Sequence, residues 1–127
     1  MREYSTPAVV EIPASASLSD TVFERAEHNP EAVVLRRKTA PAPARNRHGN
    51  RGTDRGTAWR DVTAREFRDE VAELAKGFIA AGIGEGDRVG LLSRTRYEWT
   101  VVDYALWAAG AVPVPVYETS SAEQVEW

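Results

Sequence analysis

Several side chains in this sequence belong to the types that carry out acid–base, nucleophilic or metal chemistry. They are His28, His48, Glu66, Asp69, Glu70, Glu73, Ser93, Ser120 and Ser121. His28 falls at a predicted helix end, where a positive charge favours the helix dipole, and His48 falls in a basic loop. The four carboxylates fall mainly on the polar face of one predicted helix, and the serines fit helix caps better than nucleophiles. We therefore predict no catalytic, cofactor-binding or metal-binding residue in this chain.

A glycine-rich segment, Gly82-Ile83-Gly84-Glu85-Gly86-Asp87, invites comparison with a nucleotide-binding loop. A dinucleotide-binding loop follows a strand and opens a helix, so that phosphate meets the helix N-terminus. Here the order is reversed, because the segment follows a predicted helix and precedes a strand. We interpret it as a helix stop and a turn.

A strongly basic loop is predicted over residues 38–56. Residues 36–60 contain eight Arg or Lys and one acid, Asp54, which gives a local charge of +7. The simplest interpretation is a solvated insertion, and the alternatives are contact with an anionic membrane or with RNA phosphates. No aromatic residue interrupts the loop, so base stacking has no support.

The overall composition excludes several classes of protein. The chain has 127 residues with 43% hydrophobic and 28% charged residues, which is typical of one globular domain. It has no cysteine, so disulfide frameworks and thiolate zinc sites are excluded. The net charge of −3 argues against a nucleic-acid-binding domain. With no long apolar run and no secretory signal, we expect a soluble, cytoplasmic α/β domain.

The first half of the chain is predicted to form an arm, a helix and a hairpin. Residues 1–16 are expected to form an extended N-terminal arm. Ser17 and Asp20 form a predicted capping box, followed by Leu18, Val22 and Ala26 on one helix face. Asn29-Pro30 should end this helix. Strands at 32–35 and 57–62 should then pair in an antiparallel hairpin across the basic loop.

The second half is predicted to form a long helix and one βαβ unit. Thr63 and Glu66 form a capping box, and an apolar stripe from Phe67 to Ala81 ends at Gly82. A strand at 88–92 leads through a capping box at 95–98 into a helix that ends before Gly110. The strand at 111–117 contains Pro113 and Pro115, which predict an edge or one-sided pairing. Strand, helix and strand over about thirty residues make a βαβ unit.

A last capping box, Ser120-Ser121-Ala122-Glu123, is followed by only four residues. Isolated helices of fewer than about 12 residues are marginal in water. We therefore expect residues 17–127 to be the incomplete first part of a larger domain.

Three motifs resemble those of the adenylate-forming enzymes, in particular the long-chain acyl-CoA synthetases. They are Trp59-Arg60-Asp61-Val62-Thr63-Ala64-Arg65-Glu66-Phe67, the turn from Gly82 to Val89, and Tyr97-Glu98-Trp99 followed by residues 108–119. Leu18 to Leu35 also fits the family's first helix and strand. The step to the long-chain acyl subgroup rests on residues 117–119. Two departures are Tyr97, where proline is common, and the unusually long basic loop.

The resemblance implies the α/β, luciferase-like fold and a role as scaffold of the large N-terminal AMP-binding domain. The parent enzyme would join a fatty acid to ATP, release pyrophosphate, and pass the acyl group to coenzyme A with the help of Mg²⁺. The family's phosphate loop, ribose-binding aspartate and C-terminal lysine have no counterpart here, so the resemblance assigns no catalytic residue and the chain alone should bind none of these cofactors. The alternative is a stand-alone interaction module whose Arg-rich loop binds an anionic membrane or RNA.

Overall fold

The computed structural model describes residues 5–7, 9–39 and 58–126. Its elements, in chain order, are α1 (Asp20–His28), β1 (Val33–Thr39), β2 (Ala58–Thr63), α2 (Ala64–Ala80), β3 (Arg88–Leu92), α3 (Tyr97–Ala108), β4 (Val112–Val116) and α4 (Ala122–Glu126). The described part of the predicted arm, residues 5–7 and 9–16, contains no helix or strand. Most of the basic loop lies outside the described residues.

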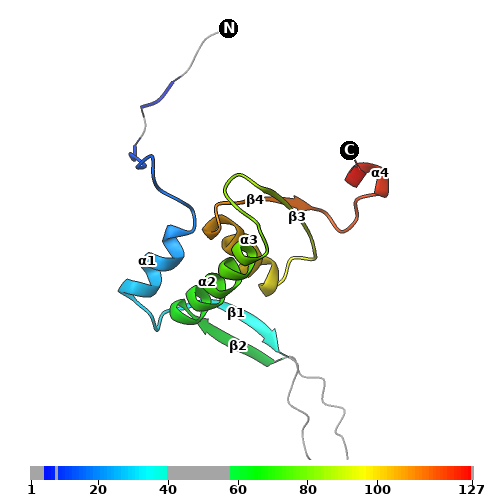
Figure 1. Cartoon of the computed structure of the whole chain (residues 1–127). Helices are drawn as coiled ribbons and strands as arrows, with labels where there is room; N and C mark the ends of the chain where they lie inside the picture. Colours follow the sequence, from blue (N-terminus) through cyan, green and yellow to red (C-terminus); the bar gives the residue numbers. More distant parts are fainter. Residues whose placement is uncertain (1–4, 8, 40–57, 127) are drawn as a thin grey trace, which may run out of the picture.

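Helices α2 and α3 pack against each other at the centre of the fold (Figure 1). Helix α1 packs on α2, and the β1–β2 hairpin lies on the other side of the helices from the β3–β4 pair. The core joins these layers, and its largest fully buried side chains are Val62, Val71 and Leu106. The predicted α/β class, with one hairpin and one βαβ unit, is confirmed.

The hairpin is antiparallel, as predicted, but its first strand extends beyond the apolar residues 32–35 from which it was predicted. Strand β1 continues through Lys38 and Thr39, two residues that the sequence placed in the basic loop. Cross-strand pairing explains the extension, because Arg36 lies opposite Asp61 and donates to it at 2.7 Å. An opposite-charge pair supports a strand that apolar residues alone do not define.

The start of α1 differs from the prediction. The helix begins at Asp20, whose carboxylate accepts a hydrogen bond from the Ser17 backbone as expected. The Ser17 hydroxyl, however, accepts from the backbone N–H of Ser19 at 3.3 Å and so makes a tight turn outside the helix. Leu18 therefore precedes the helix and is 64% exposed, while Val22 and Ala26 are buried as predicted.

Helix α2 has the capping box that the sequence predicted. The Thr63 hydroxyl accepts a hydrogen bond from the Glu66 N–H at 3.2 Å, and Glu66 Oε2 accepts from the Thr63 N–H at 3.0 Å. At the other end, Gly82 has φ +94° and closes a Schellman motif in which the Ile83 N–H reaches the Phe78 carbonyl. The glycine-rich segment is therefore a helix stop and turn.

Two other predicted capping boxes are wrong. Helix α3 begins at Tyr97 without a side-chain cap, because the Glu98 carboxylate turns to the Arg96 guanidinium at 2.5 Å. Helix α4 is capped one residue later than predicted, by Ser121 with Gln124. In both places the local pattern offers several polar partners, and the pattern alone does not choose among them.

Strands β3 and β4 are parallel neighbours, with Val89 opposite Pro113 and Leu91 opposite Pro115. Helix α3 connects them and ends at Gly110, as predicted. This arrangement brings the carboxyl ends of both strands to one edge. Trp59 of β2, the first residue of the motif that ends at Phe67, is 59% exposed on the hairpin.

Candidate functional site

The most suggestive edge of the fold is the one at which β3 and β4 end. In open α/β sheets, ligands bind beyond the carboxyl ends of the parallel strands. A cavity of about 530 Å³ lies there, between the loop that follows β3 and the segment that follows β4. Its lining consists of Ser93, Arg94, Thr95, Trp99, Pro115, Val116, Tyr117, Glu118 and Thr119.

The charges in this cavity neutralise each other. Arg94 Nε donates to Glu118 Oε2 at 2.8 Å, and this ion pair ties the two segments together. Ser93, a serine that the sequence singled out, donates its hydroxyl to the Arg94 carbonyl. No histidine of the described residues lines the cavity. The cavity offers hydroxyls, aromatic surface and an ion pair, groups that can contact a ligand.

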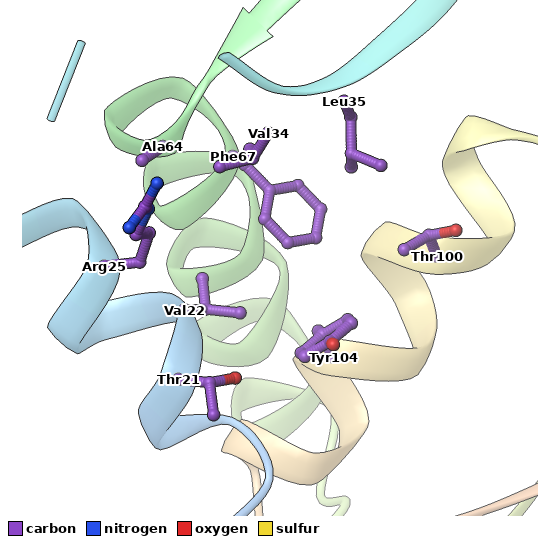
Figure 2. A pocket seen from close by; sticks show the side chains of 9 residues that line it. All are labelled: Thr21, Val22, Arg25, Val34, Leu35, Ala64, Phe67, Thr100 and Tyr104. Carbon is purple, nitrogen blue, oxygen red and sulfur yellow. The ribbon is translucent and has the colours of Figure 1, made fainter. Parts of the chain in front are cut away.

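A second cavity, of about 230 Å³, lies among α1, β1, α2 and α3. Figure 2 shows side chains from all four elements converging on it, and the rings of Phe67 and Tyr104 form part of its wall. These rings meet edge to face at 5.6 Å between centroids. Of the described residues that line it, Arg25 alone is charged, and most of the others are apolar.

The other polar residues singled out in the sequence have structural roles. His28 donates from Nδ1 to the Glu24 carbonyl at 2.8 Å, at the end of α1. Asp69 accepts from its neighbour Arg68, and Glu73 is exposed. Among the described residues, no three His, Cys, Asp or Glu side chains are placed to hold a metal ion. His48 lies outside the described residues.

The shifted pKa values follow from local contacts. Hydrogen bonding from the Thr63 backbone lowers the pKa of Glu66, and the Arg96 side chain lowers the pKa of Glu98. Burial, together with a hydrogen bond to Glu70, raises the pKa of Tyr97. Burial alone raises the pKa of Asp103 on α3. Among the described residues, none of these groups lies beside a histidine or a second shifted carboxylate in a cavity.

The structure also reveals one arrangement that the sequence analysis missed. It brings Arg36, Arg37 and Lys38 of β1 next to Arg96 at the start of α3, around a cleft. The run of three basic residues was visible in the sequence. Its meeting with Arg96 depends on how the hairpin packs on α3.

This fold is similar to part of the fold of two solved adenylating proteins. The adenylation domain of a carboxylate reductase from Mycobacterium chelonae superposes with a TM-score of 0.68 at 21% identity, over 89% of this chain and 17% of that chain. A fatty acid AMP ligase from Legionella pneumophila gives a TM-score of 0.65 at 21% identity, over 87% of this chain and 16% of that chain. At such identities the likeness concerns the fold.

The sequence comparisons define the family. The profile of the AMP-binding enzyme family matches residues 22–127, and the chain belongs to this family. It is 39% identical over its whole length to the long-chain-fatty-acid–CoA ligase FadD15 of Mycobacterium bovis. It is 35% identical over 65 residues, 51% of the chain and 11% of the relative, to a medium-chain acyl-CoA ligase, ACSF2, of Danio rerio. The chain spans 18% of the length of the FadD15 relative.

Proposed function

We propose that this chain is a scaffold segment of an AMP-forming long-chain fatty acid–CoA ligase. The observation that carries the proposal is the 39% identity over all 127 residues to a protein named as a long-chain-fatty-acid–CoA ligase. The medium-chain relative matches about half of the chain at lower identity, which favours the long-chain class. The alternative of a stand-alone interaction module gains no support, because the family match extends from residue 22 to residue 127.

The complete enzyme would couple a fatty acid to ATP to form an acyl-adenylate and pyrophosphate. It would then transfer the acyl group to coenzyme A and release AMP. Catalysis of such a transfer depends on donors and charges that are fixed around the transferring group. Mg²⁺ would supply charge neutralisation, but the described residues present no ligand set for it, so no step is assigned to a metal here.

Within that enzyme, residues 17–127 would form the first, incomplete part of the large AMP-binding domain, preceded by an arm at 1–16. The chain would hold no catalytic, cofactor-binding or metal-binding residue. Its contribution would be to position the parallel strands β3 and β4, at whose carboxyl ends the open cavity lies.

We propose that the enzyme works in the cytoplasm and makes peripheral contact with the inner face of the membrane. None of the helices among the described residues is long and apolar enough to cross a membrane. Fatty acid, ATP and coenzyme A are the proposed partners, and nucleic acid is not among them.

The proposal is tested by ATP–pyrophosphate exchange with purified protein. A complete protein carrying this sequence should exchange pyrophosphate into ATP when a long-chain fatty acid and Mg²⁺ are present, and should form the thioester when coenzyme A is added. The 127-residue chain alone should show no exchange. A complete protein that binds no ATP would contradict the assigned function, and exchange by the chain alone would contradict its role as scaffold.

A further inference from the structure

A basic cleft lies between the hairpin and the start of α3, which are side by side in Figure 1. Its volume is about 430 Å³, within the usual range for small-molecule sites. The hairpin contributes Arg36, Arg37, Lys38 and Trp59, and the start of α3 contributes residues 95–98. We call this site the basic cleft.

Positive charge dominates the lining of the basic cleft. Among the described residues, four cations line it, Arg36, Arg37, Lys38 and Arg96, against one carboxylate, Glu98. Arg36 pairs with Asp61 at 2.7 Å and Arg96 with Glu98 at 2.5 Å. All four side chains of these two pairs are more than half exposed. Exposed ion pairs of this kind contribute little, so an incoming anion can compete for the guanidinium groups.

Arg37 is the fixed element of the cleft. Its side chain is 29% exposed, and its guanidinium lies over the Tyr97 ring, 5.0 Å from the centroid. Its nearest carboxylate oxygen, on Glu70, is 3.9 Å away. The buried Nε has no hydrogen-bond acceptor among the described residues. Because this Nε is buried, the terminal N–H groups of the guanidinium are the donors that can meet a ligand in the cleft, and a planar guanidinium is suited to the oxygens of a phosphate group.

Lys38 adds a second charge that no described carboxylate neutralises. Its Nζ lies 5.3 Å from the centroid of the Trp59 ring, a cation–π contact, and no ion pair joins it to a described acid. The start of α3, which has no side-chain cap, adds a weaker attraction for anions at the same place. The cleft therefore combines the Arg37 guanidinium, which packs on Tyr97, with the Lys38 ammonium. Arg36 and Arg96 add two guanidinium groups whose exposed ion pairs an anion can replace.

We propose that the basic cleft binds a phosphate group. This inference goes beyond the proposed function, since the nucleotide phosphates of that reaction require a phosphate loop that these residues do not include. The phosphate could belong to a free small molecule or to a lipid headgroup, and both present the same oxygens to Arg37 and Lys38. The lining residues that carry this proposal belong to β1, β2 and the start of α3, all within the described part of the chain.

The experiment uses the complete protein and two charge-matched double variants. Lys38→Gln with Arg96→Gln removes two exposed cations of the cleft, and Arg25→Gln with Arg65→Gln removes two exposed cations outside it. Inorganic phosphate is titrated into each protein in a calorimeter at low ionic strength. We expect at least tenfold weaker binding in the cleft variant and less than twofold change in the control. Equal weakening in both variants would overturn the proposal, because it would show a bulk charge effect.

A second arm distinguishes the source of the phosphate. Each protein is sedimented with phosphatidylcholine vesicles that contain or lack phosphatidylglycerol. Weaker binding of both free phosphate and vesicles in the cleft variant alone would support a lipid headgroup as the source, and weaker binding of free phosphate with unchanged vesicle binding would support a free small molecule. Unchanged binding of both free phosphate and vesicles in the cleft variant would overturn the proposal. The variant Arg37→Lys keeps the positive charge but loses the planar guanidinium, which can donate two hydrogen bonds to one phosphate group. It should weaken phosphate binding several-fold, and an unchanged circular dichroism spectrum would show that the fold is intact.

Discussion

The hydroxyl of Tyr97, in the first turn of α3, donates a 2.8 Å hydrogen bond to Glu70 Oε2 in the middle of α2. It is a polar link between two helices that otherwise meet through apolar side chains. The Tyr97 ring also packs edge-on against Phe67 of α2 and under the Arg37 guanidinium of β1. One residue thus joins α3 to both α2 and the hairpin, and it forms one wall of the basic cleft.

Replacing Tyr97 by Phe should loosen the start of α3 without removing the ring. Loss of one hydrogen bond costs about 1 kcal/mol, which corresponds to about fivefold faster exchange by local opening. Hydrogen-exchange mass spectrometry of the complete protein, on peptides that cover residues 97–101, measures this. Tyr104→Phe is the control, because no hydrogen bond from its hydroxyl is present among the described residues. An equal effect of both variants would contradict the assigned link.

The capping box of α2 predicts a difference between two substitutions at one position. Thr63→Ala removes the hydroxyl that accepts from the Glu66 N–H, and such a loss costs about 1 kcal/mol. Thr63→Ser keeps an acceptor at the same place and should preserve most of the protection. Amide exchange in the first turn of α2 is the measurement. Similar exchange in the Ala and Ser variants would mean that the cap does not stabilise this helix.

The elements that the sequence predicted correctly are those whose signals are local. The Thr63–Glu66 box and the glycine stops at Gly82 and Gly110 each depend on a few adjacent residues, and each is present. The capping box predicted at residues 95–98 is absent because Arg96, which lies between the two expected partners, binds the Glu98 carboxylate instead. A pattern rule does not see that competitor.

The basic cleft could not be predicted, because its two sides are far apart in the sequence. Arg37 and Tyr97 are sixty positions apart, and their contact depends on the angle at which the hairpin packs on α3. Likewise, β1 extends to Thr39 because Arg36 finds Asp61 across the hairpin, and neither residue marks a strand by itself. Local sequence patterns were enough to predict the fold class, whereas the basic cleft forms only when the hairpin packs against α3.

Asp103 should reduce stability at neutral pH. Burial raises its pKa, so the folded protein holds the proton more tightly than the unfolded chain. Stability from this group is therefore full below the unfolded pKa and is lost as pH rises through the higher folded value. Asp103→Asn should raise the thermal midpoint at pH 7, and the gain should vanish below about pH 4. Asp69→Asn, at an exposed ion-paired site, should give no gain at pH 7, and a gain there equal to that of Asp103→Asn would contradict the role of burial.

The isolated 127-residue chain should associate through the β3–β4 pair. Leu92, Val112 and Val114 lie on one face of this pair and are 61%, 48% and 41% exposed. Exposed apolar faces and strand edges promote association. Size-exclusion chromatography should show oligomers, and Val112→Lys with Val114→Thr should increase the monomer fraction. A monodisperse wild-type monomer with a sharp unfolding transition would contradict this expectation.

Two glycines should respond in opposite directions to the same substitution. Gly110 has φ +80°, and an added Cβ would lie 3.3 Å from the Glu85 Cα, so Gly110→Ala strains the backbone and crowds the preceding turn. Left-handed backbone at a non-glycine residue costs about 1–2 kcal/mol. Gly77 lies inside α2 with no atom within 4 Å of an added Cβ, so Gly77→Ala should stabilise the helix by about 1 kcal/mol.

Thermal midpoints of the complete protein compare these two variants directly. Gly110→Ala should lower the midpoint, because the Gly86 N–H to Gly110 carbonyl bond of 2.9 Å joins this turn to the one before β3. Strain at Gly110 therefore reaches both parallel strands. Gly77→Ala should raise the midpoint. If both substitutions lowered it equally, the effect would come from the added methyl group alone, and the assigned roles of the left-handed backbone and of the close approach to Glu85 would be wrong.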